Sequence, residues 1–339
     1  MLTLDVMDDI EMSPRPWGQV AVAAGLLMPN YHLPWTRTEI ALEGSEKIPE
    51  GPVIFAMNHT DRYNYWPFQY RIWRDQGRYT TTWVKGKYYN HPVLRTFMIK
   101  TGNLAVPSKG YLITADAARV LGKAPGDKLY RILRDGVDAG EMDTKPLRQR
   151  AAEEGVLSQM VPLLDTPRDM LGRRFDPHQE NYLEAMDALF GAMMDKFVEL
   201  NEQAFDVGLS VLVFPEGRRS VRLQDGKPGV AQMALRMGAT VVPVGCNGSH
   251  EVYPGDSPVA SGGEIVYRVG DALRPTEELS EFAIDEPFTP FTREASERFG
   301  DRFQGVTELI MERIAGLLDE RHQPLEGHDE GTTGSDRFV

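Results

Sequence analysis

One histidine and one pair of arginines stand where two apolar stretches end, and these residue types suggest acid–base chemistry on an anionic substrate. His59 lies in residues 58–64, after the apolar stretch 53–57, and Arg218 and Arg219 lie in residues 214–220, after the apolar stretch 211–214. Because each apolar stretch predicts a buried strand, both segments are predicted to be loops at strand ends, where open α/β sheets bind ligands. The combination predicts a general base that faces an anion.

Each segment also has a purely structural interpretation. A histidine on a loop is more often structural or solvated than catalytic, and Phe214-Pro215-Glu216-Gly217 by itself is typical of a turn. Both segments nevertheless occur in one chain, in this order and each after a strand. Their joint occurrence favours an active site.

Four short blocks together resemble the glycerolipid acyltransferase superfamily, of the lysophosphatidic acid acyltransferase type. The blocks are Asn58-His59; a weaker second block with Lys85, Pro92, Gly102 and Val106; Phe214 to Ser220, followed by Lys227-Pro228-Gly229; and Val242-Pro243-Val244, followed by Gly248-Ser249. The resemblance covers roughly residues 37–275, apart from a long insertion. It implies an α/β fold with a mixed, largely parallel central sheet flanked by helices.

The resemblance also implies a reaction and a set of site residues. A fatty acyl group would pass directly from acyl-CoA or acyl carrier protein to a hydroxyl of lysophosphatidic acid or glycerol phosphate, with His59 as the general base. The residues expected to shape the phosphate site are Glu216, Gly217, Arg218 and Arg219, with Lys85, Lys109 and Lys227 as further candidates. Arg219 matches the family's phosphate ligand, since a guanidinium can bind phosphate through two parallel hydrogen bonds. No metal or cofactor is expected beyond the acyl donor, because no metal-ligand cluster or nucleotide loop has the required spacing.

The chain departs from the family pattern at three positions. Asn64 stands where the family has the aspartate that orients the histidine, Arg218 replaces a threonine, and Ser108 replaces an arginine. The loss of arginine at Ser108 weakens the case for a glycerol phosphate acceptor, although Lys109 would restore that charge.

Asn64 is the departure that matters most for catalysis. An asparagine can accept a hydrogen bond from the ring of His59, but it provides no charge to stabilise the imidazolium formed during proton transfer. We expect, in descending order, rescue by Asp61 or a distant carboxylate, a slower asparagine-assisted enzyme, or a non-catalytic protein that binds lipids or acyl thioesters. Asp61 lies two residues from His59, so it can help only if this loop is not helical.

The strands and helices that would position these residues follow from the hydrophobic pattern. Strands are predicted at 38–42, 53–57, 79–84, 104–106, 210–214, 240–244 and 264–269, with helices between several of them. We expect residues 1–36 to form a lead-in, residues 37–320 an acyltransferase α/β domain that includes a helical insertion, and residues 323–339 a polar, disordered tail. The last helix is predicted at 306–320.

Residues 110 to about 207 form an insertion that the family does not usually have. A strong amphipathic helix is predicted from Glu180 to Leu200, and shorter helices are predicted around 114–121, 128–134 and 147–160. Such an insertion could act as a lid, an acyl-chain tunnel or a dimer face, although its apolar stripe is more often plain core.

Composition limits the environment and the partners. The chain has 339 residues, a net charge of −13 and one cysteine, Cys246, which excludes a disulfide framework, is expected to be buried and inert, and fits a reducing cytoplasmic compartment. The start of the chain lacks a signal-like pattern, and its longest apolar stretch, 20–28, is too short to span a bilayer. The net charge argues against binding to nucleic acid.

Charge is unevenly distributed along the chain. Residues 62–110 contain nine basic residues and the single acidic residue Asp75, interleaved with many aromatic residues. This pattern suits peripheral contact with the cytoplasmic face of a membrane. The alternatives are core aromatics beside a solvated basic face and, with less support, a surface for single-stranded nucleic acid.

Overall fold

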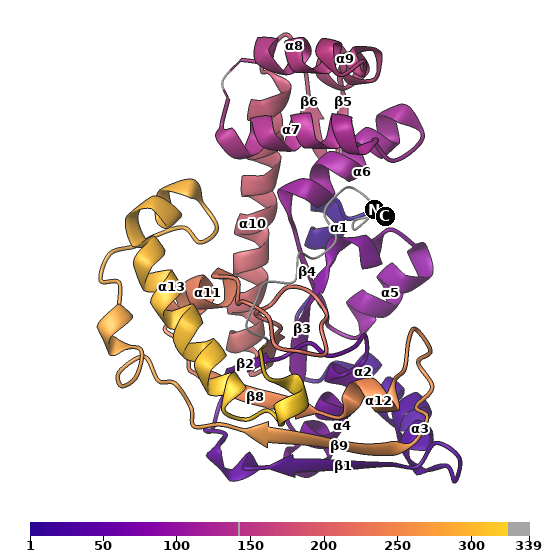
Figure 1. Cartoon of the computed structure of the whole chain (residues 1–339), viewed down its shortest axis with the longest axis vertical. Helices are drawn as coiled ribbons and strands as arrows, with labels where there is room; N and C mark the ends of the chain where they lie inside the picture. Colours follow the sequence, from indigo (N-terminus) through magenta and orange to yellow (C-terminus); the bar gives the residue numbers. More distant parts are fainter. Residues whose placement is uncertain (142, 325–339) are drawn as a thin grey trace.

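The computed structural model of the chain describes residues 1–141 and 143–324, and it has the predicted α/β fold. Its seven-stranded sheet has the order β1-β9-β8-β2-β7-β3-β4 (Figure 1). The strands are β1 (Thr38–Glu43), β2 (Ile54–Met57), β3 (Thr80–Lys85), β4 (Leu104–Val106), β7 (Ser210–Val213), β8 (Val241–Asn247) and β9 (Gly263–Val269). Each of the seven predicted strands is present, with ends that differ by at most three residues.

The sheet is mixed but largely parallel, as predicted. β2 pairs in parallel with β7 on one side and with β8 on the other, whereas β8 and β9 are antiparallel. The carboxyl ends of β2, β7 and β8 therefore lie at the same edge of the sheet. All four residues of β2 are buried, which is typical of a central strand covered on both faces.

Alternation along β2 divides the core into two layers. Phe55 and Met57 pack in a cluster with Phe68 and Ile72 of helix α4 (Tyr65–Gln76). Ile54 and Ala56 face the opposite layer. That layer contains α11 (Gly229–Met237) and α13 (Arg293–Ala315). The lead-in packs mainly on the first layer through α2 (Trp17–Val22), η1 (Ala23–Leu27) and α3 (Met28–His32).

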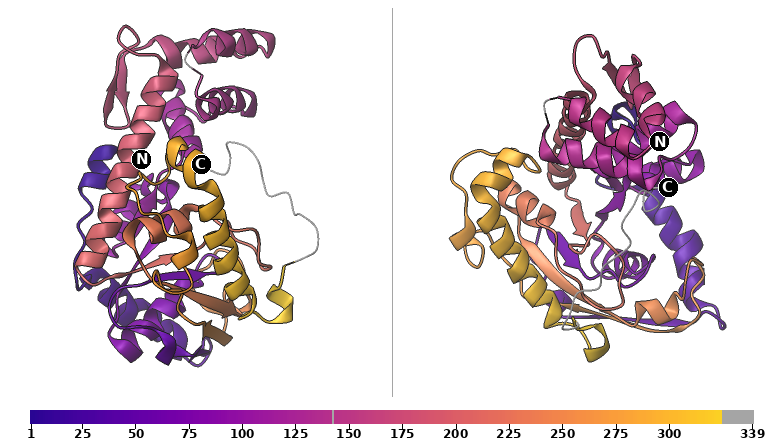
Figure 2. Two further views of the ribbon diagram at one scale, coloured as in Figure 1. Left: turned by 90° about the vertical axis from the view of Figure 1, so that its left-hand side faces the viewer. Right: turned by 45° about the horizontal axis from the view of Figure 1, so that its top comes forward.

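The insertion forms a helical lobe that stands above the sheet (Figure 2). It contains α6 (Lys109–Leu121), α7 (Asp127–Ala139), α8 (Lys145–Glu153), α9 (Leu157–Asp165), the hairpin β5 (Arg168–Met170) and β6 (Arg173–Phe175), and α10 (Tyr182–Asp206). α10 begins at a capping box formed by Asn181 and Glu184, and it runs from the lobe down to the sheet. The first helix, α1 (Leu4–Asp8), packs in the core of this lobe.

The remaining elements are short. They are α5 (Pro92–Lys100), α12 (Ser249–Val252), and η2 (Ser45–Lys47), η3 (Gly86–Tyr89), η4 (Ser280–Phe282) and η5 (Glu320–His322).

Two predicted helices differ from the structure, and one hairpin was not predicted. The helix predicted at 147–160 is two helices, α8 and α9, separated at Gly155, whose φ of 72° ends a right-handed helix. The last helix starts at Arg293 rather than at residue 306, because Thr292 caps it, and it ends at Ala315. The β5–β6 hairpin was not predicted, since strands of three residues leave little pattern. Of the tail predicted to be disordered, residues 325–339 lie outside the described residues.

Candidate active site

The two loops singled out in the sequence meet at the carboxyl edge of β2 and β7. The carboxylate of Glu216 accepts hydrogen bonds from the backbone N–H of His59 (2.7 Å) and of Gln224 (3.0 Å). In the opposite direction, the N–H of Ser220 donates to the carbonyl oxygen of His59 (2.8 Å). Residues far apart in the sequence thus fix the backbone of His59 on both sides.

Asn58 fixes the same loop to the neighbouring strand β8. Its side-chain oxygen accepts from the N–H of Cys246 (2.6 Å), and its amide nitrogen donates to the carbonyl of Cys246 (3.0 Å). Cys246 is buried, and burial raises the pKa of its thiol to about 12, so the thiol stays protonated. Asn58 therefore serves to position His59.

Asn64 determines which nitrogen of His59 carries the proton. The side-chain nitrogen of Asn64 donates to the carbonyl of Asn58 (2.8 Å), an atom that can only accept. The side-chain oxygen of Asn64 therefore faces Nδ1 of His59 at 3.0 Å, and Nδ1 must be the donor. In the neutral ring this leaves Nε2 unprotonated and able to accept a proton.

The surroundings of His59 keep its ring neutral. The ring stacks on Phe214, with centroids 3.9 Å apart and planes at 14°. Burial lowers the pKa of His59 to about 3; the hydrogen bond to Asn64 opposes this shift, whereas the positive charges of Arg219 and Lys85 add to it. At neutral pH the ring is ready to accept a proton, but it is a weak base.

Asp61 does not take the place of the missing aspartate. Its carboxylate accepts from the N–H of Tyr63 (2.8 Å) and from the hydroxyl of Thr60 (2.9 Å), within its own loop. Burial raises its pKa against these hydrogen bonds. The loop is not helical here, as rescue would have required, yet the contact to Nδ1 of His59 is made by Asn64.

The structure gives Glu216, Gly217 and Arg218 mainly structural positions. Burial raises the pKa of Glu216 to about 7, although its two backbone hydrogen bonds lower it. Arg218 donates to the side-chain oxygen of Gln224 (2.6 Å), across the same loop. Gly217 turns the chain at a φ of 66°, which a residue with a side chain adopts at a cost.

The remaining basic candidates lie at different distances from His59 along the sheet. Arg219 is about half exposed, and its charge reaches the ring of His59. Lys85 ends β3, two strands from β2, and also influences the ring. Lys227 is exposed, with its stem close to Gly217. Lys109 follows β4, three strands or about 14 Å from β2, and pairs with Asp187 (2.8 Å).

Sequence reasoning missed several residues that support the site. Tyr267 of β9 donates its hydroxyl to the backbone carbonyl of Asn64 (2.5 Å), and Phe214 supports the ring of His59. Arg62 and Asp256 also lie at this edge and form an ion pair (3.1 Å). Arg62 is in the same loop as His59, and this closeness in sequence could have indicated that Arg62 belongs to the site.

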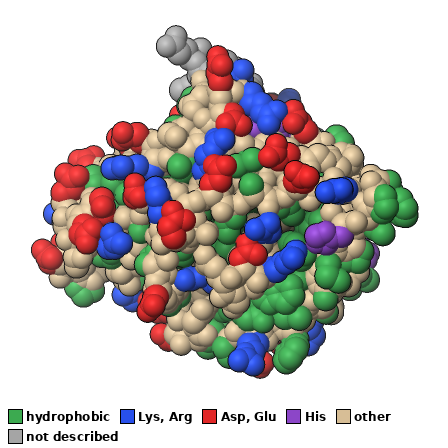
Figure 3. All heavy atoms as spheres, turned by 90° about the horizontal axis from the view of Figure 1, so that it is seen from below, with side chains coloured by type: hydrophobic (Ala, Val, Ile, Leu, Met, Phe, Trp, Pro, Cys, Tyr) green, Lys and Arg blue, Asp and Glu red, His purple; other side chains and the backbone are tan. Residues whose placement is uncertain are grey.

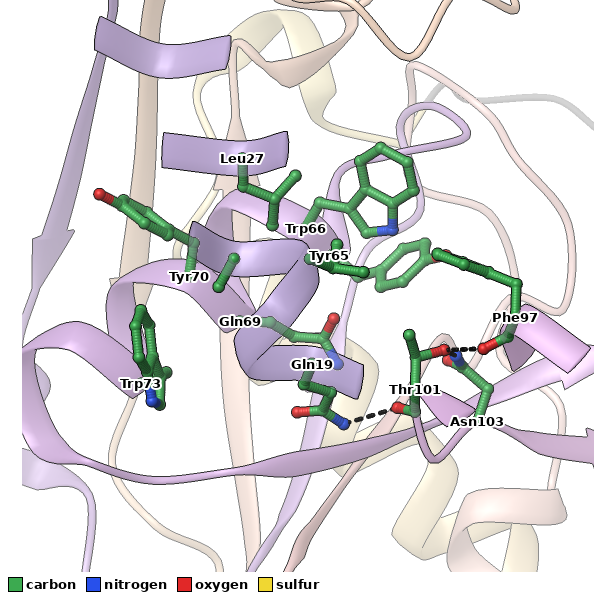
Figure 4. Close-up of a pocket in the computed structure, with 12 residues that line it drawn as sticks. Gln19, Leu27, Tyr65, Trp66, Gln69, Tyr70, Trp73, Phe97, Thr101 and Asn103 are labelled. Carbon is green, nitrogen blue, oxygen red and sulfur yellow. Dashed lines mark hydrogen bonds between the residues drawn. The ribbon is translucent and has the colours of Figure 1, made fainter. Parts of the chain in front are cut away.

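A small apolar pocket lies beside the site, between the lead-in helices, α4 and α5 (Figure 4). Its lining includes Tyr65, Trp66 and Phe97, and Gln19 closes one side by donating to the carbonyl of Thr101 (2.8 Å). Tyr65 also contacts Phe214, the ring on which His59 stacks. The space is about 30 Å³, which is room for a single water molecule.

Comparison with family models gives a match over the part of the chain that contains the second loop. A family model described as Acyltransferase matches residues 187–247. This segment contains β7, residues 214–220 and β8, but not His59. A comparison with curated proteins found no match.

A solved structure is similar over most of the chain. It is the crystal structure of the 1-acyl-sn-glycerophosphate (LPA) acyltransferase, PlsC, from Thermotoga maritima, with 12% sequence identity and a TM-score of 0.36, covering 88% of this chain and 94% of that chain.

Proposed function

We propose that this protein transfers a fatty acyl group from an acyl thioester, acyl-CoA or acyl carrier protein, to a hydroxyl of a phosphate-bearing acceptor such as lysophosphatidic acid or glycerol phosphate. The observation that carries the proposal is the state of His59. Its ring is neutral, its proton is held on Nδ1 by Asn64, and its Nε2 is left to accept a proton beside the charges of Arg219 and Lys85. The family match to residues 187–247 supports acyl transfer as the reaction type.

In the proposed reaction His59 acts first as a base and then as an acid. Nε2 takes the proton of the acceptor hydroxyl while its oxygen attacks the carbonyl carbon of the thioester. The tetrahedral intermediate collapses, the C–S bond breaks, and the departing thiolate takes the proton from the imidazolium. A new ester and a free thiol result. No acyl-enzyme is needed because a thioester is already activated.

Asn64 allows this cycle but slows it. Its oxygen orients the ring and accepts from Nδ1 throughout, yet it provides no negative charge when the imidazolium forms. We therefore expect a slow enzyme. The acceptor's phosphate would bind at Arg219, with the charge of Lys85 also acting near His59. The stem of Lys227 lies close to Gly217, and Lys109 pairs with Asp187.

The proposed reaction uses no metal or cofactor. Within residues 1–141 and 143–324, no cluster of three histidine, cysteine, aspartate or glutamate side chains could hold a metal ion. The absence of a cofactor stays a prediction. The apolar pocket beside Tyr65 holds an acyl chain only if its aromatic side chains move, since its present volume is about 30 Å³.

Contact with a membrane surface is proposed for the lead-in rather than for the aromatic segment 62–110. Each aromatic side chain of that segment is buried or half-buried, as expected for core aromatics. The lead-in instead exposes apolar side chains, namely Trp17, Leu26, Met28, Leu33 and Trp35. Residues 12–38 contain two arginines and no acidic residue, in a chain of net charge −13.

The surface view agrees with this distribution. Hydrophobic side chains gather on the lower right of the underside, and most acidic side chains lie toward its upper and left parts (Figure 3). Among the described residues, the helices are too short or too polar to cross a bilayer. The proposed contact is therefore peripheral, through apolar and aromatic side chains.

The direct test is turnover by purified protein. Release of free thiol from acyl-CoA or from acyl carrier protein is measured with lysophosphatidic acid or glycerol 3-phosphate as the acceptor. His59→Ala should abolish release while the fold is kept, because a general base contributes chiefly in the transition state. His91→Ala, at an exposed histidine before α5, is the matched control and should be fully active.

Two outcomes would contradict the proposal. Full turnover by His59→Ala would remove His59 from the mechanism. Tight binding of acyl-CoA or of lysophosphatidic acid by the wild-type protein, with no thiol release under any condition, would support the non-catalytic binding protein instead.

A further inference from the structure

An aspartate carboxylate lies between two arginines next to the candidate active site. Asp256 is on the loop between α12 and β9. Its Oδ1 is 3.1 Å from Nη1 of Arg62 and 3.9 Å from Nη1 of Arg219. Two guanidinium groups from different loops thus converge on a single oxygen atom.

Arg62 is held in place for this contact. Its guanidinium lies 5.9 Å from the centre of the Tyr63 ring and 5.8 Å from that of Tyr88, within the range of cation–π attraction. The hydroxyl of Tyr63 donates to the backbone carbonyl of Asp256 (2.7 Å). Arg62 follows His59 by three residues, in the same loop.

The second arginine connects this ion-pair cluster to the general base. Arg219 is in the loop that donates from Ser220 to the carbonyl of His59. After burial, the positive charge of Arg219 is among the causes that lower the pKa of His59. Arg62, Arg219 and His59 therefore border a common region of the surface.

The charges of this cluster do not balance. One carboxylate faces two guanidinium groups, so a net positive charge remains. A phosphomonoester dianion would neutralise both arginines and offers three oxygen atoms, each able to accept charge-assisted hydrogen bonds. The Asp256 carboxylate binds the two guanidinium groups less well, because the distance from its Oδ1 to Nη1 of Arg219 is longer than that of a hydrogen bond.

The aspartate is also easy to displace. Its side chain is 77% exposed, and exposed ion pairs contribute little to stability. The backbone of Asp256 is anchored by Tyr63, and the loop beyond it by hydrogen bonds from Asn30 to Pro258 and from Ala260 to Asn30. Rotation of one side chain, without movement of the loop, would vacate the position between the arginines.

We propose that Arg62 and Arg219 together form the phosphate site of the acceptor, and that Asp256 occupies this site as a built-in counter-ion which the phosphate displaces. The inference rests on the proposed function for the nature of the ligand. It adds a second arginine that the sequence motifs do not assign, and an aspartate that competes with substrate.

Binding of phosphate without any acyl donor tests the site. The affinities for inorganic phosphate and for glycerol 3-phosphate are measured by titration calorimetry. Asp256→Asn should bind both about two- to fivefold more tightly, which is the range expected when a weak, exposed ion pair is removed. Arg62→Gln and Arg219→Gln should each weaken binding about tenfold or more, as expected for the loss of a charge-assisted hydrogen bond.

The chain offers matched controls at the opposite edge of the sheet. Asp271 is 75% exposed and pairs with a single lysine, Lys47, so Asp271→Asn changes the net charge equally and should leave phosphate affinity unchanged. Arg274 is 45% exposed and pairs with Glu277, which makes Arg274→Gln the control for Arg219→Gln. Thermal unfolding of all variants confirms that they are folded.

A vesicle-binding experiment distinguishes a free phosphate ester from a lipid headgroup as the ligand of this site. Phosphatidylcholine vesicles with and without lysophosphatidic acid are compared in sedimentation binding with the same variants. A dependence on Arg62 and Arg219 for glycerol 3-phosphate, for lysophosphatidic acid or for both supports the site and identifies its source of phosphate.

Specific results would overturn the inference. They are an Asp256→Asn variant that binds phosphate no better than Asp271→Asn, or an Arg62→Gln variant that binds as well as Arg274→Gln. The phosphate and vesicle binding experiments contain no thioester. If phosphate binding depends on the two arginines as expected but the protein transfers no acyl group, only the proposed function is refuted. Acyl transfer without arginine-dependent phosphate binding would refute only the inference.

Discussion

Replacing Asn64 by aspartate should strengthen His59 as a base, and the structure allows the size of the effect to be worked out. The new carboxylate would replace an amide oxygen that lies 3.0 Å from Nδ1. An imidazolium and a carboxylate about 4 Å apart attract by about 4 kcal/mol at an effective dielectric constant of 20, which corresponds to roughly three pKa units.

A lost hydrogen bond opposes this gain. The amide nitrogen of Asn64 donates to the carbonyl of Asn58, and an ionised aspartate has no proton to give. Leaving that carbonyl without a donor costs about 1–3 kcal/mol of stability. Burial also disfavours the charged carboxylate, but the ring Nδ1–H of His59 and the positive end of the α4 dipole favour it, since residue 64 is the N-cap of α4.

The expected net result is a more basic His59 in a less stable protein. We expect the pKa of His59 to rise by about 1–3 units, from about 3 to the range of roughly 4–6. Thiol release should increase on the order of tenfold, because proton transfer becomes more favourable. The pKa is measured by NMR titration of the ring, assigned with His59→Gln, and turnover is measured on the same samples.

Asn181→Asp is the matched control, since it adds the same charge at the N-cap of α10 in the lobe and should alter neither quantity. An unchanged pKa of His59 in Asn64→Asp would refute the claim that residue 64 controls the ring. A raised pKa with lost turnover would mean that another relay serves the reaction, and Asp61→Asn should then be the damaging change.

Three further outcomes are expected. Glu216→Gln should lower turnover and cost about 1–3 kcal/mol of stability, because one of the two backbone N–H groups would face an amide NH₂; equal turnover in the variant would show that this clamp is dispensable. The stability of the protein, followed by urea unfolding, should depend on pH in opposite senses through two groups. The raised pKa of Glu216 contributes stability that is lost as pH rises from 4.5 through about 7, and the lowered pKa of His59 contributes stability that is lost as pH falls from 6.5 to about 3. The Glu216→Gln variant should therefore lose stability mainly as pH falls, and the His59→Gln variant should lose stability mainly as pH rises. Identical profiles of stability against pH in the two variants would contradict both assignments. Trp17→Ala and Trp35→Ala should reduce sedimentation with anionic vesicles and leave turnover on glycerol 3-phosphate unchanged, whereas Val161→Ala in the lobe should change neither vesicle binding nor turnover. Undiminished vesicle binding by the tryptophan variants would remove the lead-in as the contact surface.

The strands and the position of His59 could be predicted because they depend on local pattern. A continuous apolar run such as residues 53–57 predicts a central strand, and a polar loop after it falls at the carboxyl edge of the sheet. The strands predicted at 53–57 and 210–214 were found by this rule. The first half of α13 was not, because its polar start at Arg293 gives little apolar periodicity before Phe299.

The roles of individual side chains depend on contacts that sequence spacing does not reveal. The Glu216 carboxylate bonds the backbone of His59, 157 residues away in the chain, so a residue expected to face the substrate instead joins two loops. Asp61 is close to His59 in sequence but bonds its own loop. Composition likewise cannot predict which aromatic side chains are exposed. Tyr89 is fully buried and Trp17 is 75% exposed, yet both are aromatic residues in segments with few acidic residues.

The neutral Asn64 and the positive charges of Arg219 and Lys85 together give the site a property that an aspartate at residue 64 would suppress. With a carboxylate beside Nδ1, the base strength of His59 would be set mainly by that fixed charge. With Asn64, the electrostatic influences on the ring are positive, from Arg219 and Lys85, and they hold its pKa down together with burial. A dianionic acceptor bound at Arg219 would cancel part of this positive field, so His59 would become a stronger base only when the phosphate is in place. His59 would then be a weak base in the free protein, where water competes with the acceptor hydroxyl for the acyl group. It would be a stronger base in the complex with the phosphate-bearing acceptor.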